Sequence, residues 1–322
     1  MKLLAAVVLL GLGLVGVYAQ SSKQSNPVVS VQGILAGKNP GSPGSKPFEA
    51  NTKRSLSSKQ RTIPVDRKDF VFTLDRGDGL KTRDIVMKWI PMGMSSTEFQ
   101  MGSTEETDPD RFPDETPHLV TLSSGFWLME TEATEEMYHA VMGINPSGSS
   151  RPDHPVMMVS WNDATNFCWN IKNNSLLKQS FDLTGFEFRL PTEAEWECAC
   201  RAGSRTAEYL YTGNRKTELN IIAWWDWNSR KTTQPVRQKT PNVWGLYDMI
   251  GNVWEWCSDW YGDYPTTVVK NPVGPASGSE RVFRGGGWRS MEWDARSARR
   301  DKYAPDGRFN DIGFRPALSR IR

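Results

Sequence analysis

The sequence predicts an α+β domain with little regular secondary structure, and two features of the chain support this. Helix-start patterns are confined to the middle of the sequence, between residues 134 and 203. Beyond them, residues 204–322 are rich in Gly, Pro, Asn and Trp and contain only short candidate strands. A long stretch of this kind inside a domain usually needs metal ions, polar networks or aromatic packing to hold it. We therefore expect an irregular second half that is held together by specific sites.

The first residues of the chain are typical of a secretory signal peptide. Residues 1–19 combine a basic start at Lys2, an apolar stretch and a small residue at Ala19, after which we expect cleavage. The alternative is an N-terminal membrane anchor, although the apolar stretch is short for a membrane span. No other long apolar run follows. We therefore expect a secreted or periplasmic protein with no membrane span after signal cleavage.

Residues 20–83 are expected to form a disordered linker and a transition into the folded domain. Up to about Arg61 the segment is mainly Ser, Gly, Lys, Pro and Asn with a single aromatic residue, so ordering it would bury little apolar surface. Asp69–Thr73 is a candidate short strand. All 14 tryptophans lie at Trp89 or later, and we place the folded domain at residues 84–322.

Five elements of this domain follow from local patterns. A Ser or Thr side chain that accepts a hydrogen bond from the third helical residue starts a helix, and acidic residues in the first turn favour the helix dipole. Ser160 with Asp163 and Thr192 with Glu195 have this spacing, and Gly203 is the expected end of the later helix. In chain order, we expect strands at Ile85–Ile90 and Phe99–Met101, and helices at about Thr134–Met142, after Ser160 as far as Ile171, and between Thr192 and Gly203.

Charge and cysteine content narrow the class of protein. The chain has 39 Lys and Arg against 37 Asp and Glu, a net charge of +2, and this balance indicates no nucleic-acid partner. Cys168, Cys198, Cys200 and Cys257 permit up to two disulfides, but a domain of this size does not need them. Two interpretations stay open: four small buried side chains, or one disulfide with Cys257 as a candidate member.

Four motifs occur in order along the domain: Arg189–Glu197 (RLPTEAEWE), Gly251–Trp256 (GNVWEW), Arg284–Trp288 (RGGGW) and Gly313–Arg315 (GFR). Together they resemble the formylglycine-generating enzyme family, also called the sulfatase-modifying-factor domain. The resemblance covers nearly the whole domain. It implies a compact, irregular α+β fold related to C-type lectins, with bound calcium.

The resemblance also implies a specific oxidation chemistry. Enzymes of this family oxidise a cysteine of a client sulfatase to formylglycine, with molecular oxygen and a copper(I) ion held by two thiolates. Copper(I) prefers soft thiolate ligands. In this chain Ser290 stands where the first thiol would be, and no cysteine follows Cys257. A serine hydroxyl is hard and protonated at neutral pH, so we expect no copper and no copper oxidation.

The calcium motif of the family is kept. Carried over residue by residue, the ligands are the side chains of Asp248 and Glu255 and the backbone carbonyls of Gly251 and Val253. Calcium accepts mixed carbonyl and carboxylate ligands, so the set is chemically reasonable. The alternative is that Asp248 and Glu255 pair with arginines such as Arg284 or Arg299.

The segment after the glycine turn is the candidate ligand-binding region, because in the family it lines the substrate pocket. The candidate contacts are Trp288, Arg289, Ser290 and Glu292, since arginine beside tryptophan suits carboxylates, sulfates or peptides. The alternative is that the arginines of this segment pair with nearby acids. Arg284 and Arg315, which belong to the motifs themselves, are expected to be structural.

Three functional hypotheses remain. The first is a secreted protein of this family without copper, which binds a protein, peptide or small-molecule ligand. The second is an oxidoreductase or protein-modifying enzyme of the same family with altered chemistry. The third is a target-binding protein diversified by a retroelement, although Arg and Asp rather than Asn, Ser and Tyr predominate in the tail of this chain.

Overall fold

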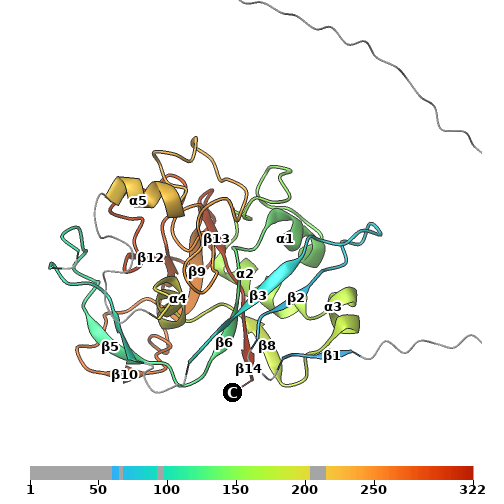
Figure 1. Ribbon diagram of the computed structural model, residues 1–322, viewed down its shortest axis with the longest axis horizontal. Helices are drawn as coiled ribbons and strands as arrows, with labels where there is room; N and C mark the ends of the chain where they lie inside the picture. Colours follow the sequence, from blue (N-terminus) through green and yellow to red (C-terminus); the bar gives the residue numbers. More distant parts are fainter. Residues whose placement is uncertain (1–59, 65–67, 93–97, 107, 204–214, 322) are drawn as a thin grey trace, which may run out of the picture. The chain divides into compact units, whose positions relative to one another are not determined.

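The computed structural model describes residues 60–64, 68–92, 98–106, 108–203 and 215–321, which belong to one structural unit, Leu56–Arg322. The expected signal peptide and the linker as far as residue 59 lie outside the described residues. The strands are β1 Arg61–Thr62, β2 Phe70–Phe72, β3 Ile85–Ile90, β4 Glu98–Met101, β5 His118–Thr121, β6 Phe126–Met129, β7 Phe181–Asp182, β8 Phe186–Arg189, β9 Trp254–Trp260, β10 Val269–Lys270, β11 Arg281–Arg284, β12 Arg300–Tyr303, β13 Ile312–Phe314 and β14 Ala317–Arg320 (Figure 1). The helices are α1 Glu135–Met142, α2 Trp161–Ile171, α3 Ser175–Ser180, α4 Glu193–Cys200 and α5 Arg215–Ile222.

The two ends of the described chain meet in one five-stranded sheet with the order β2-β3-β6-β14-β8. The last strand, β14, lies between β6 and β8, with Leu318 opposite both Trp127 and Phe188. The candidate strand at Asp69–Thr73 is confirmed by β2, which pairs with β3 (Figure 1). The sheet therefore includes residues that precede Asp84. The folded part of the chain begins before residue 84, where the sequence led us to place the start of the domain.

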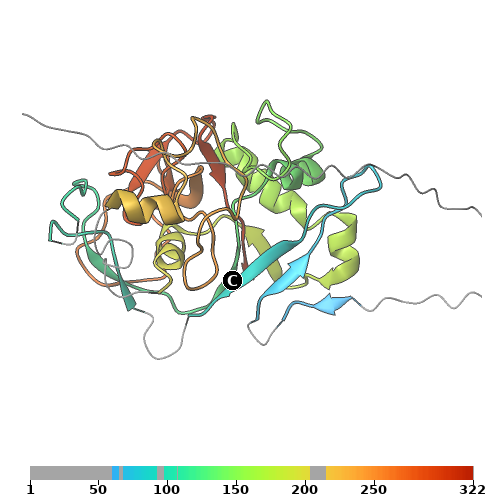
Figure 2. The same ribbon diagram turned by 45° about the horizontal axis from the view of Figure 1, so that its top comes forward.

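A four-stranded sheet with the order β12-β11-β9-β13 brings the sequence motifs together. Within it Glu255 of β9 lies opposite Arg284 of β11 and Gly313 of β13. In Figure 2 the orange-red strands of this sheet lie apart from the cyan pair β2–β3. Two smaller sheets complete the set, with the orders β10-β5-β4 and β1-β7.

The three helices expected from capping patterns are confirmed. Thr134, Ser160 and Thr192 are the N-caps of α1, α2 and α4, and the last two form complete capping boxes with Asp163 and Glu195. In α4 every side chain is buried, including those of three glutamates, so this helix needs charged partners inside the domain. Two helices were not expected: α3, which is short and capped by Asn174, and α5, which lies in the half expected to be irregular.

The four cysteines are buried free thiols, so the disulfide interpretation is wrong and the buried-side-chain interpretation holds. Cys168 packs in one hydrophobic cluster with α1, α2 and β13, and the other three pack in a second cluster around α4. No helix among the described residues has the length and apolar character needed to cross a bilayer.

Candidate functional site

The centre of the four-stranded sheet is a buried ion pair between Glu255 and Arg315. Arg315 donates to both oxygens of the Glu255 carboxylate, from Nη2 to Oε1 at 2.7 Å and from Nε to each oxygen at 3.1 Å. Trp196 of α4 donates from Nε1 to Oε2 at 2.8 Å. Both charged side chains are almost completely buried. The glutamate of the GNVWEW motif is therefore paired with the arginine of the GFR motif rather than with Arg284 or Arg299.

Arg284 has a separate structural role on the adjacent strand. Its guanidinium binds Glu193 at 2.6 Å and also binds Glu197, so it neutralises two of the buried glutamates of α4. Arg300 makes a second ion pair with Glu193, at 2.8 Å. Although burial alone would raise it, these two arginines hold the pKa of Glu193 below its usual value. Removing one partner of such a buried pair leaves an uncompensated charge. Loss of either arginine would therefore destabilise the packing of α4.

The turn that carries the expected calcium ligands is unusual in its backbone. Asp248, Gly251 and Asn252 have φ values of 53°, 82° and 59°, in the left-handed region that non-glycine residues seldom adopt. At Gly251 a Cβ atom would come within 2.3 Å of the Trp224 carbonyl oxygen, so glycine is required there. Residues in such strained conformations cluster at active sites and at sites that hold ligands.

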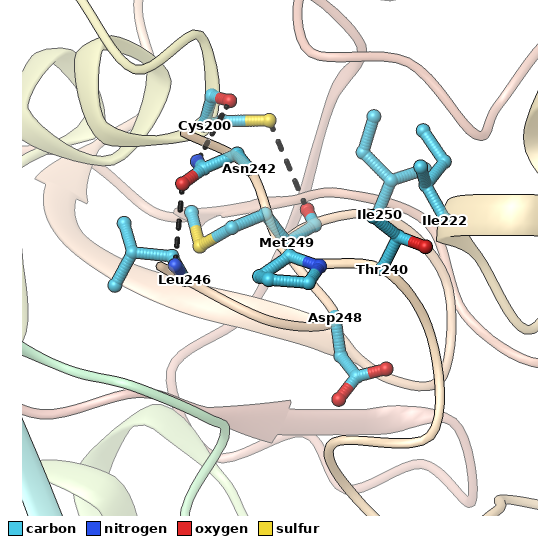
Figure 3. Close-up of a pocket in the computed structure, with 9 residues that line it drawn as sticks. Cys200, Ile222, Thr240, Asn242, Leu246, Asp248, Met249 and Ile250 are labelled. Atoms are coloured by element: carbon cyan, nitrogen blue, oxygen red, sulfur yellow. Dashed lines mark hydrogen bonds between the residues drawn. The ribbon is translucent and has the colours of Figure 1, made fainter. Parts of the chain in front are cut away.

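The carboxylate of Asp248 is buried and only half satisfied. Its Oδ2 accepts the backbone N–H of Arg237 at 2.9 Å, whereas its Oδ1 has no hydrogen-bond partner among the described residues. Burial raises the pKa of Asp248 to about 6. The side chain borders a small cavity of about 190 Å³ (Figure 3). The carboxylate is thus an acceptor that lacks a donor or a cation.

A third carboxylate, Glu132, joins this group although the sequence indicated no role for it. Glu132 is fully buried, and neither of its carboxylate oxygens has a hydrogen-bond partner in the part of the chain that the structure describes. Burial and the nearby charge of Asp248 raise its pKa well above the usual value, against the opposing effect of Arg315. No local pattern marks this residue, because Asp248, Glu255 and Arg315 all lie more than 100 positions away in the chain.

With Glu132 and Asp248 ionised, three carboxylates would face one guanidinium, and a divalent cation would correct this deficit of positive charge. The expected set of Asp248, Glu255 and the two carbonyls fits calcium in this respect, since unsatisfied oxygens and excess negative charge are what a hard cation requires. No three acidic, His or Cys side chains among the described residues converge in a metal-binding arrangement. A calcium site here would therefore depend on the carbonyl oxygens of Gly251 and Val253.

The residues present do not fit a copper(I) pair. The hydroxyl oxygen of Ser290 is buried and accepts the backbone N–H of Gly287 at 2.9 Å, which stabilises the glycine turn. Burial raises the pKa of Cys198 and of Cys200 to about 12, so these thiols stay protonated at neutral pH. Copper(I) requires thiolates, and no step through copper is derived for this chain.

The four candidate ligand-binding residues differ in exposure. Arg289 is exposed and forms a two-point ion pair with Asp311, at 2.6 and 3.1 Å. Trp288 is half-buried and donates from Nε1 to the carbonyl of Asn310 at 2.8 Å. Glu292 is half-buried, and Ser290 is buried inside the turn. Arg289 and Trp288 can therefore reach a ligand directly, whereas Ser290 supports the turn.

A second segment lies beside this region, and the sequence did not indicate it. The backbone N–H of Asp226 donates to the carbonyl of Ser290 at 3.1 Å. The next residue, Trp227, is 75% exposed, and Met291 and Trp293 are 43% and 45% exposed. We call Trp227, Trp288, Arg289, Met291 and Trp293 the recognition surface. Trp227 stands in the run Trp224-Trp-Asp-Trp227, and no local pattern distinguishes the exposed ring from the others.

The remaining arginines of the segment also pair with acids, Arg296 with acids far away in the chain and Arg299 with acids close to it. Arg296 binds Asp108 at 2.5 Å and Glu115 at 2.6 Å, and it is almost fully buried. Arg299 binds Asp294 and Asp301, each at 2.9 Å.

Comparisons with known proteins establish the family of this chain. The chain matches the family described as sulfatase-modifying factor enzyme 1-like domain over residues 87–320, and it belongs to that family. It is 35% identical to the formylglycine-generating enzyme of Bos taurus over 187 residues, 53% of this chain and 46% of the bovine protein, so it spans about half of that relative's length. The chaperone protein LppX of Paenibacillus barcinonensis is 32% identical over 240 residues, 62% of this chain and 82% of that one.

A solved structure has a similar fold over most of the chain. Treponema denticola variable protein 1 has a TM-score of 0.64 and 31% identity, and the match covers 79% of this chain and 99% of that one. The fold is therefore the C-type-lectin-like fold of the formylglycine-generating enzymes, as the sequence motifs indicated.

Proposed function

We propose that this chain is a secreted binding protein of the sulfatase-modifying-factor family, which recognises a protein or peptide partner or a small ligand and performs no copper chemistry. The observation that carries the proposal is the recognition surface. Three large apolar side chains, Trp227, Met291 and Trp293, are exposed on two segments that hydrogen-bond to each other. Exposed apolar side chains scattered singly are ordinary, but a group of them rimmed by charge is typical of an interaction site.

Arg289 supplies the polar part of this surface. Tryptophan and arginine are the residue types that most often carry binding energy at protein interfaces. The guanidinium is half-exposed while it pairs with Asp311, so an incoming carboxylate or sulfate can share it without a change in the backbone. The name of the relative LppX, a chaperone, is consistent with protein recognition by a member of this family.

The absence of copper chemistry rests on the donor set. Ser290 occupies the position of the first thiol, and its oxygen is engaged by Gly287 within the turn. The four cysteines are buried on other elements as protonated thiols. The proposal also takes the first 19 residues as a signal peptide, which would deliver the protein to the periplasm or outside the cell.

Structural calcium completes the proposal. Asp248, Gly251, Val253 and Glu255 would hold the ion and fix the strained turn beneath the motifs. The support is the unsatisfied Oδ1 of Asp248 and the excess of buried carboxylate around Arg315.

Site-specific photo-crosslinking tests the recognition surface. Variants would carry a photoreactive phenylalanine at Trp293 or at Trp169, which is 66% exposed on α2 and serves as the matched control. Both would be irradiated in the extracellular fraction of the producing cell. We expect a discrete adduct from position 293 alone, and its loss when Arg289→Ala and Trp227→Ala are added.

Circular dichroism is the control for folding. We expect the variants to be folded, because Arg289 and Trp227 lie outside the buried core. Equal crosslinking from both positions, or an adduct that survives Arg289→Ala with Trp227→Ala, would place the binding surface elsewhere.

A further inference from the structure

A cavity of about 600 Å³ lies between the N-terminal end of α4 and the loop that follows β9. It shares no lining residue with the recognition surface or with the expected calcium ligands. One side of its wall is formed by Met101, His118, Glu193, Ala194 and Arg300, and the other side by most of the residues between Asp259 and Pro275. A volume of this size is within the range of small-molecule sites.

The wall of this cavity is largely apolar. Met101, Val268, Val273 and several prolines line it, together with the rings of Trp260 and Tyr264. Pockets that bind small molecules are commonly built in this way, with a few polar groups to fix the orientation of the ligand. The charged groups of the wall therefore decide what the cavity can bind.

Most of those charged groups are already neutralised or exposed to solvent. Glu193 is paired with Arg284 and Arg300, at 2.6 and 2.8 Å, and Arg300, which also lines the cavity, has its charge neutralised by this pairing. Asp263 and Lys270 are exposed and opposite in charge. The ring of His118 lies 4.6 Å from that of Tyr264, and its Nδ1 is 3.1 Å from the carbonyl oxygen of Thr116.

Asp259 is the exception. Its side chain is 3% exposed, and its Oδ2 accepts the backbone N–H of Glu193 and the hydroxyl of Ser258, both at 2.9 Å. No ion pair to Asp259 occurs among the described residues. Arg281, on the adjacent strand, donates to the Ser258 carbonyl and stacks between two tryptophans, and it acts on Asp259 only through the longer-range effect of its charge. Burial and the charge of Glu193 raise the pKa of Asp259 to about 7.

We propose that this cavity binds a small organic ammonium ion with an apolar body, and that Asp259 is its counter-ion. A buried carboxylate without a cation is costly, and a protonated amine in the cavity would supply the missing charge. The apolar wall would contact the body of the ligand, and a neutral ligand of the same shape would gain only that contact. The inference concerns a different surface from the proposed function, so either can fail alone.

Isothermal titration calorimetry at pH 8 tests the cavity with 2-phenylethylamine and its neutral counterpart 2-phenylethanol. We expect the amine to bind at least about tenfold more tightly than the alcohol. Asp259→Asn keeps an acceptor for the Glu193 N–H but removes the charge, and we expect it to abolish this preference. Asp263→Asn, an exposed acid of the same wall, is the matched control and should bind as the unaltered protein does.

Three results would overturn the inference: no heat of binding at millimolar amine, equal affinity for the amine and the alcohol, or unchanged affinity in Asp259→Asn. If Asp259→Asn does not fold, Val273→Trp decides the matter. Val273 is 57% exposed at the wall, so a larger side chain can be accommodated there and would fill the cavity while leaving the carboxylate intact. Loss of amine binding in that variant supports the site, and retained binding refutes it.

Discussion

Removal of calcium is expected to lower the stability of the domain, because buried carboxylates would lose their counter-ion. Glu132, Asp248 and Glu255 surround a single guanidinium, that of Arg315. A ligand that binds only the folded state at a concentration of 100 times its Kd adds about 2.7 kcal/mol of stability. For a domain of about 240 residues, each kcal/mol shifts Tm by about 2–4 °C. Excess EGTA should therefore lower Tm by about 5–10 °C.

Asp248→Asn separates the calcium effect from the intrinsic cost of the buried charge. The pKa of Asp248 is raised from 3.8 to about 6 in the folded protein, so the stability that its protonated form contributes is present below about pH 4 and lost as pH rises through 6. At pH 7.5 that loss is about 3 kcal/mol. The asparagine keeps an oxygen for the Arg237 N–H and has no charge. In EGTA the variant should therefore be more stable than the unaltered protein, while its response to calcium should shrink.

Differential scanning calorimetry at pH 7.5, with 1 mM calcium or with EGTA, measures both effects, and elemental analysis of the purified protein counts the bound ion. Asp306→Asn is the matched control, because Asp306 is exposed and should change neither curve. The reasoning is refuted if the protein carries no calcium and its Tm is the same in EGTA. A destabilised Asp248→Asn in EGTA would refute the charge argument separately.

Three further outcomes are expected. Arg315→Ala should cost about 3–5 kcal/mol in urea unfolding, because it leaves Glu255 buried without its partner; a loss below about 1 kcal/mol would contradict this. The pKa of Asp259 is raised to about 7, so its contribution to stability is present below about pH 4 and lost as pH rises through 7. Asp259→Asn should flatten that decline between pH 4 and 8, and an unchanged pH profile of urea midpoints would count against the assignment. Incubation with copper(I), oxygen and a peptide containing Cys-x-Pro-x-Arg should leave the peptide mass unchanged; formylglycine above a protein-free control would overturn the copper argument.

Elements stabilised by contacts within a few residues could be predicted from the sequence. The capping boxes at Ser160 and Thr192 join side chains three residues apart, so their patterns are visible in the chain itself. The strand Ile85–Ile90 was predicted with the same bounds as β3. The family and its C-type-lectin-like fold were also predicted correctly, because the motifs keep their order over most of the domain.

Helices without a strong local signal were missed. The six residues of α3 depend on the side chain of Asn174, which also binds the backbone of Asp75 from across the fold. The helix α5 lies in a region whose Gly, Pro and Trp content favours irregular structure, and its Leu219 is fully buried in the second hydrophobic cluster. Tertiary packing outweighed weak local preference at both positions.

The sequence alone determined which chemical groups are available: four motifs in order, carboxylates and a turn suited to calcium, and Ser290 in place of a thiol. The tertiary structure decided which of these groups meet. It paired Glu255 with Arg315 across 60 positions of the chain and added Glu132 to their neighbourhood. It also placed Asp259 in the wall of a cavity with no ion pair to any other described residue. Electrostatic partners in a folded protein are selected by distance and burial in space, and local sequence carries little information on either.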